Sequence, residues 1–178
     1  MRRLQMVAVF VLVFLAIGIV AEEKLDRLVV MGQGFSFGVK EPDGWQGDTE
    51  NAKEIPANIV FYSKTQKWQN SNPIIYIQIT DKSNEDLAGD IAADMKAWKE
   101  RYPSIAFKDF SASHPKYSTA AREFCVEGKF TEYVVFASPG KEKPLKFSAI
   151  LNVQKREATE QELATLREVV NSLVLLAP

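Results

Sequence analysis

The sequence predicts an α+β fold in which two helices cover the two faces of an antiparallel β-sheet. Most of the chain consists of short segments in which apolar residues alternate or run continuously, with turn residues between them. Two longer segments, residues 84–103 and 159–176, instead repeat apolar residues every three or four positions, as amphipathic helices do. Residues 74–80 ("IIYIQIT") are apolar on both faces, which is typical of a strand covered on each side. We therefore expect a three-layer α/β/α sandwich.

The strands are predicted from alternation and from the turns that separate them. Residues 35–39 ("FSFGV") alternate, so one side of this strand should be buried. The "PDG" at 42–44 is turn chemistry, and we expect Trp45, which follows it, to cover the edge of the sheet. Gly128 joins two later strands as a hairpin. The other predicted strands are residues 58–63, 74–80, 105–110, 119–127, 130–137 and 145–153.

Residues 84–103 form the clearest predicted helix. Asn84 can cap it, and Glu85 and Asp86 suit the positive end of the helix dipole. Pro103 ends it, because proline cannot continue a helix. The apolar stripe of this helix consists of Leu87, Ile91, Met95, Trp98 and Tyr102.

The closing helix is predicted over residues 159–176, where Thr159 and Glu162 fit a capping box. Its buried stripe consists of Leu163, Leu166, Val170 and Leu173. Because no internal repeat or interdomain linker interrupts the chain, residues 22–178 are expected to form one α+β domain.

Residues 1–21 have the layout of a secretory signal peptide. Arg2 and Arg3 supply a positive end, an apolar run follows, and Ala21 stands at the cleavage position. The alternative is an uncleaved N-terminal anchor, because the run approaches the roughly 18 to 20 apolar residues that a membrane span requires. Under either interpretation we expect residues 22–178 to be exported, periplasmic or otherwise extracytoplasmic, with membrane contact only through the N-terminal segment.

The composition argues against several classes of chemistry. A formal net charge of −1 provides no basic field for phosphate backbones, so nucleic-acid binding is not expected. His114 is the only histidine, which is too few for the usual histidine-based zinc sites, and no serine-nucleophile motif accompanies it. The only cysteine, Cys125, is expected as a small residue in a strand, with a reactive thiol as the alternative. We therefore expect no catalytic residue, cofactor or metal ligand.

Two features are candidates for contact with a partner. Asp86, Asp90 and Asp94 recur every fourth residue and so predict an acidic ridge beside the apolar stripe of the first helix. The ridge suits a basic partner or a cation; the simpler alternative is a solvated face, and a rigid helix face makes a poor calcium site. Trp68 lies in a polar loop, residues 64–73, where it can serve an interface or pack beneath its own loop.

The order of the elements resembles that of the PsbP-like superfamily, which includes the extrinsic PsbP proteins of photosystem II and the envelope protein DcrB. The matching features are an opening strand that runs into "EPDGW", with Pro42, Gly44 and Trp45, then two strands, a long helix, antiparallel strands and a closing "LREVVNSL" helix. The resemblance covers about residues 33–176. It implies a three-layer α/β/α fold and a mainly non-enzymatic accessory role, and it transfers no metal ligand or partner contact to this chain.

The function expected from these observations is that of a non-catalytic accessory or protein-binding module of the cell envelope. Export, a compact α+β domain and the missing catalytic constellation motivate this expectation. The alternative is an envelope protein that binds a small molecule, a lipid or an ion between the sheet and a helix.

Overall fold

The computed structural model describes residues 27–82, 86–140 and 143–176. The predicted export segment, residues 1–21, and the predicted helix cap Asn84 lie outside these residues. Among the helices of the described part, none is long and apolar enough to cross a membrane.

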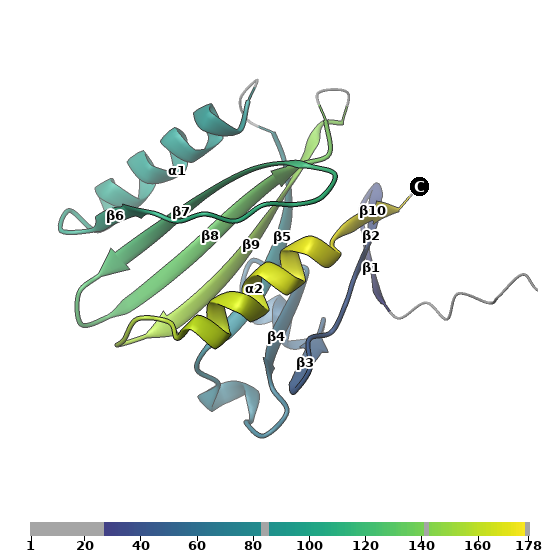
Figure 1. Cartoon of the computed structure of the whole chain (residues 1–178), viewed down its shortest axis with the longest axis horizontal. Helices are drawn as coiled ribbons and strands as arrows, with labels where there is room; N and C mark the ends of the chain where they lie inside the picture. Colours follow the sequence, from purple (N-terminus) through teal and green to yellow (C-terminus); the bar gives the residue numbers. More distant parts are fainter. Residues whose placement is uncertain (1–26, 83–85, 141–142, 177–178) are drawn as a thin grey trace, which may run out of the picture.

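A seven-stranded antiparallel sheet forms the centre of the molecule (Figure 1). Its strands are β3 (Trp45–Asp48), β4 (Ile59–Ser63), β5 (Ile74–Asp81), β6 (Ala106–Asp109), β7 (Ser118–Val126), β8 (Phe130–Ser138) and β9 (Leu145–Gln154). The strand order is β3-β4-β5-β9-β8-β7-β6, so β5 lies inside the sheet, as its two apolar faces predicted. Gly128, at a φ of 70°, makes the predicted turn between β7 and β8. Trp45 begins the edge strand β3.

A second, three-stranded sheet was not predicted. Its strands are β1 (Leu28–Gly32), β2 (Phe35–Val39) and β10 (Val174–Leu176), in the order β1-β2-β10. The prediction that residues 159–176 are helical to their end is therefore wrong. The chain leaves the helix after Ser172 because the residues of β10 pair with β2, which gives their backbone groups partners and covers an edge of that sheet.

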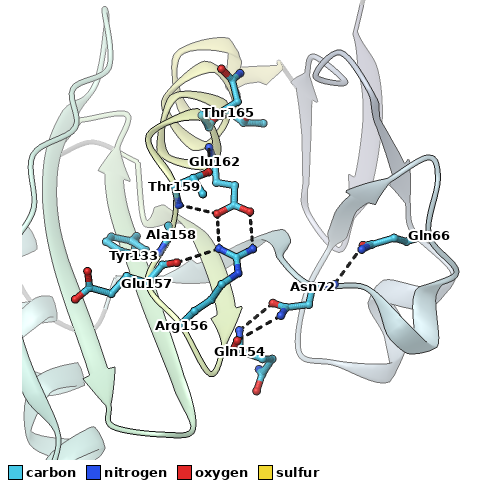
Figure 2. Close-up of polar contacts among 11 residues, drawn as sticks. Gln66, Asn72, Tyr133, Gln154, Arg156, Glu157, Ala158, Thr159, Glu162 and Thr165 are labelled. Atoms are coloured by element: carbon cyan, nitrogen blue, oxygen red, sulfur yellow. Dashed lines mark hydrogen bonds and ion pairs between the residues drawn. The ribbon is translucent and has the colours of Figure 1, made fainter.

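Helix α2 (Glu160–Ser172) and the small sheet cover one face of the large sheet (Figure 1). Side chains of β4, β5, β8 and β9 point into this core, where Phe37 of β2 meets Phe147 of β9 edge to face at 6.0 Å. The predicted capping box is present: Thr159 Oγ1 accepts the Glu162 N–H, and Glu162 Oε2 accepts the Thr159 N–H at 2.8 Å (Figure 2). Arg156 donates to both carboxylate oxygens of Glu162, at 2.7 and 2.8 Å.

Helix α1 (Leu87–Arg101) covers the opposite face of the sheet over β7 and β8. Asp86 caps it by accepting the Gly89 N–H at 2.8 Å, so the N-cap is two residues later than predicted. The predicted apolar stripe packs on the sheet around Phe124, and Trp98 stacks on Tyr102 with ring centroids 5.6 Å apart.

Two short 3₁₀ helices, η1 (Asn51–Glu54) and η2 (Trp68–Asn70), lie beside β4 and β5, over the far end of this same face. They enclose a small apolar cluster around Val60 and Tyr62. The α1 face is thus covered at its two ends by different segments of the chain, which leaves the middle of the face less covered.

His114 is buried in the connection between β6 and β7. Its Nδ1 accepts the backbone N–H groups of Lys116 and Tyr117, both at 3.0 Å, so the ring proton lies on Nε2 and is donated to the Leu173 carbonyl at 2.9 Å. The ring also stacks on Tyr117, with centroids 4.2 Å apart. These contacts fasten the β6–β7 connection to the end of α2.

Candidate functional site

A cleft of about 530 Å³ opens on the α1 face of the large sheet. Its floor comes from β5, β8 and β9, and its walls come from Trp98 and Arg101 of α1 and from Ile55 and Pro56, which follow η1. The polar side chains that line it are Gln78, Asp94, Glu132, Ser148, Asn152 and Gln154. Ligand pockets in proteins typically span roughly 300 to 1,000 Å³ and combine apolar walls with a few placed polar groups, as this cleft does.

Glu132 of β8 is the most deeply buried charged residue of the cleft, with 5% of its surface exposed. Its Oε1 accepts two hydrogen bonds, from the Tyr76 hydroxyl at 3.1 Å and from the Asn152 amide at 2.7 Å. Its Oε2 makes no hydrogen bond to any side chain or backbone group of the described residues. A buried carboxylate normally uses both oxygens, so Glu132 retains accepting capacity at the cleft.

A chain of side-chain amides connects Glu132 to the loop that contains η2. Asn152 accepts a hydrogen bond from the Gln154 side chain at 2.6 Å. The Asn72 side chain in turn pairs with the Gln154 backbone, accepting its N–H at 2.9 Å and donating to its carbonyl at 3.3 Å (Figure 2). Gln66 accepts the Asn72 backbone N–H at 3.3 Å. The polar lining of the cleft is therefore held in place by both the sheet and the 64–73 loop.

Burial sets the electrostatics of the cleft. Loss of water raises the pKa of the Glu132 carboxyl above 4.5, and the hydrogen bonds from Asn152 and Tyr76 and the positive charge of Arg101 oppose that rise. Burial, reinforced by the neighbouring Glu132, raises the pKa of the Tyr76 hydroxyl. The pKa of Asp94 is also raised, mainly by burial. Arg101 itself is exposed, and its guanidinium lies over the rings of Trp98 and Tyr102.

The prediction that Asp90 belongs to an exposed acidic ridge is wrong. Asp90 is 1% exposed and pairs with Lys146 of β9 at 3.0 Å, which ties the first half of α1 to the sheet. The Asp90 carboxylate therefore lies on the inner face of the helix together with the apolar stripe, because Lys146 lies opposite it on the sheet and balances its charge. Asp86 caps the helix at the surface and Asp94 faces the cleft, so the three aspartates have three different environments.

Trp68 lies half-buried in η2, beside its own loop. Its indole N–H donates to Glu54 at 2.7 Å, and its ring packs against Tyr62 with centroids 5.7 Å apart. Cys125 is a half-buried residue of β7 whose sulfur accepts a hydrogen bond from Thr131 at 3.6 Å. Contact of Trp68, Asp86 or Asp94 with a partner stays a prediction.

No family model matches the chain, and no curated protein matches its sequence. Among solved structures, the solution structure of cyanobacterial PsbP (CyanoP) from Synechocystis sp. PCC 6803 is similar, with a TM-score of 0.53 over 88% of this chain and 96% of that chain. The chain has a PsbP-like fold. The fold predicted from element order and "EPDGW" is thereby confirmed. At 12% sequence identity, the likeness concerns the fold alone.

Within this PsbP-like fold, sequence reasoning missed the cleft and its buried carboxylate. One signal was available: Glu132 interrupts the apolar segment "FTEYVVFA" at an inward position. The register places Glu132 directly opposite Asn152, and Tyr76 comes from the next strand beyond β9. Without that register, the three side chains are 56 and 20 positions apart and do not form a recognisable motif.

Proposed function

We propose that the chain is a non-catalytic accessory module that works outside the cytoplasm and binds a protein partner through the cleft of the α1 face. The observation that carries this proposal is the set of side chains that gather at the cleft. Trp98, Tyr76 and Arg101 line it, and Trp68 lies in the neighbouring apolar cluster, which also contains Tyr76. Tryptophan, tyrosine and arginine are the residue types that dominate binding energy at protein interfaces.

The arrangement of these groups also suits a partner. The Glu132–Asn152–Gln154–Asn72 chain fixes the polar groups before binding, so little ordering entropy is lost when a partner docks. Arg101 is exposed and held over two rings, which presents its donors at the rim. Preorganisation of this kind strengthens recognition of a partner.

The extracytoplasmic part of the proposal rests on residues 1–21, with their positive start and apolar run. Fractionation of cells that produce the full chain, with sequencing of the mature N-terminus, tests it. We expect the protein in the extracytoplasmic fraction, either starting at Glu22 after cleavage or retained by an intact N-terminus. Recovery in the cytoplasm would contradict this part of the proposal.

Site-specific photocrosslinking in the native cells tests the partner site. A photoreactive amino acid is placed at Ala97 or at Gln78, both on the cleft, and at Gln161, exposed on α2 at the opposite face, as the matched control. We expect a discrete adduct with the same protein from both cleft positions and none from Gln161. An adduct from Gln161 alone, or no adduct from either cleft position, would overturn the proposed site.

A small-molecule-binding role is the second candidate, and the cleft volume of about 530 Å³ favours it. A thermal-shift screen separates the two candidates. A ligand present at about 100 times its dissociation constant stabilises the folded state by about 2.7 kcal/mol. Stabilisation by a small molecule that Q78K abolishes supports this candidate, whereas absence of any shift in a screen of lipids, amines and metals removes it.

A further inference from the structure

The cleft contains a carboxylate oxygen that the fold itself does not use, on a glutamate that is otherwise buried. Glu132 is 95% buried, yet both of its hydrogen bonds converge on Oε1, and Oε2 has none from the described residues. A carboxylate removed from water costs free energy unless its oxygens are paired. Here Tyr76 and Asn152 hold the carboxylate in position while its second oxygen lies at the cleft, which is the geometry of a ligand-binding group.

The charges that face Glu132 indicate what this ligand carries. From α1, Arg101 is the nearest cation and Asp94 supplies a second carboxyl on the cleft wall; from β5 and β9, Tyr76 and Asn152 are uncharged donors. The Arg101 guanidinium lies over the rings of Trp98 and Tyr102, and among the described residues it acts on Glu132 through its charge, without an ion pair. Lys146 of β9, which pairs with Asp90, acts on Asp94 through its charge in the same way. Two carboxyls therefore face the cleft.

We propose that the cleft binds a protonated amine or guanidinium group, with Glu132 Oε2 as its counter-ion and the apolar walls around Trp98 enclosing the carbon chain that carries it. The inference rests on the proposed function for the source of this group, which is a lysine or arginine side chain of the protein partner. Long basic side chains suit such a site because their apolar stems pack while the charged end forms the ion pair. The cation replaces the water that Glu132 has lost and favours its ionised form, so binding releases protons.

The direct test uses probes that share one carbon chain. Hexylammonium, hexanol and heptanoate share a hexyl chain and differ only in the head group, and the tripeptides acetyl-Leu-Lys-Leu-amide and acetyl-Leu-norleucine-Leu-amide differ only in the ammonium. Each is titrated against the isotope-labelled domain, residues 22–178, while the Asn152 side-chain amide and the Trp98 indole signals are followed by NMR. We expect the two cationic probes to bind and to shift both signals, and the neutral and anionic probes to bind at least tenfold more weakly.

Variants make the test specific to Glu132. Glu132→Gln keeps the acceptor for Tyr76 and Asn152 and removes the charge, and we expect at least tenfold weaker binding of both cations, as for loss of a charged hydrogen-bond partner. Gln78→Lys, at the rim, replaces the amide that donates to the Pro56 carbonyl by a competing cation and should also weaken binding. Glu168→Gln removes an exposed carboxylate on α2 and should leave binding unchanged.

The outcomes distinguish this inference from the proposed function. Equal binding of hexylammonium and hexanol, or unchanged affinity in both Glu132→Gln and Gln78→Lys, overturns the cation site even where crosslinking identifies a partner at the cleft. Binding of hexylammonium but not of the lysine peptide would support the cation site and assign it to a small amine. It would then refute the claim that the cation comes from a side chain of a protein partner. At a pH below the raised pKa of Glu132, calorimetry in buffers of different ionisation enthalpy should detect proton release in the wild type and none in Glu132→Gln.

Discussion

The buried ion pair between Asp90 and Lys146 should be the most sensitive link between helix α1 and the sheet. The two side chains are 0% and 8% exposed, and their charged atoms lie 3.0 Å apart. Lys146→Met keeps most of the aliphatic stem and removes the charged ammonium, which also lies over the Phe136 ring. Asp90 is then buried without its lysine, and loss of one member of a buried pair costs about 3–5 kcal/mol.

The double variant Asp90→Asn with Lys146→Met separates the charge from the packing. Because a buried pair that is replaced as a unit by neutral groups of similar size is often nearly neutral, we expect most of the loss to be recovered, with a coupling of about 2 kcal/mol or more. Lys53→Met provides the matched control, because Lys53 and Glu50 form an exposed pair at 2.7 Å whose loss should cost less than about 1 kcal/mol.

Urea unfolding followed by far-UV circular dichroism measures these free energies, with the slope of the transition checked for two-state behaviour. A loss of less than about 1 kcal/mol for Lys146→Met, equal to that of Lys53→Met, would refute the reasoning. So would a double variant as unstable as the sum of the two single variants, because the two charges would then act independently.

Three further predictions concern other parts of the molecule. His114→Ala should destabilise the fold by about 2–4 kcal/mol in chemical denaturation, since it leaves the Leu173 carbonyl and two N–H groups without partners and removes a ring stack. Burial raises the pKa of Glu132 in the folded state, so the contribution of this group to stability is present below pH 4.5 and is lost as the pH rises through the raised pKa. Between about pH 4 and pH 7, the free energy of unfolding of Glu132→Gln should therefore increase relative to that of the wild type. A difference that does not change with pH would contradict this. Thr159→Ala should cost about 0.5–2 kcal/mol through loss of the α2 cap, whereas Thr159→Ser should retain most of the stability.

The features predicted correctly from the sequence are those that short-range physics determines. The strand at residues 35–39, the interior strand at 74–80 and the capping box of Thr159 each depend on neighbours within a few positions, although residues 36–39 are all buried and do not alternate as predicted. The α+β class, with helices on both faces of an antiparallel sheet, then follows, because antiparallel strands and two amphipathic helices have few ways to bury their apolar faces.

The features that sequence reasoning missed depend on contacts between distant segments. Strand β10 exists because residues 174–176 pair with β2, more than 130 positions earlier, and without that pairing their apolar character extends the helical pattern. Asp90 is indistinguishable from Asp86 and Asp94 by spacing, and the sequence does not show that Lys146 of the sheet lies opposite it and pairs with it. The cleft likewise requires the register of β5, β8 and β9, which the strand sequences do not specify.

Hydrogen–deuterium exchange on the domain, free and bound to the partner that crosslinking identifies, tests the central claim most directly. If the α1-face cleft receives the partner, protection should increase in the C-terminal half of α1, at Ile55 and along β5, while α2 and the β1-β2-β10 sheet stay unchanged. Protection confined to α2 or to the small sheet, with the cleft unaltered, would contradict the account.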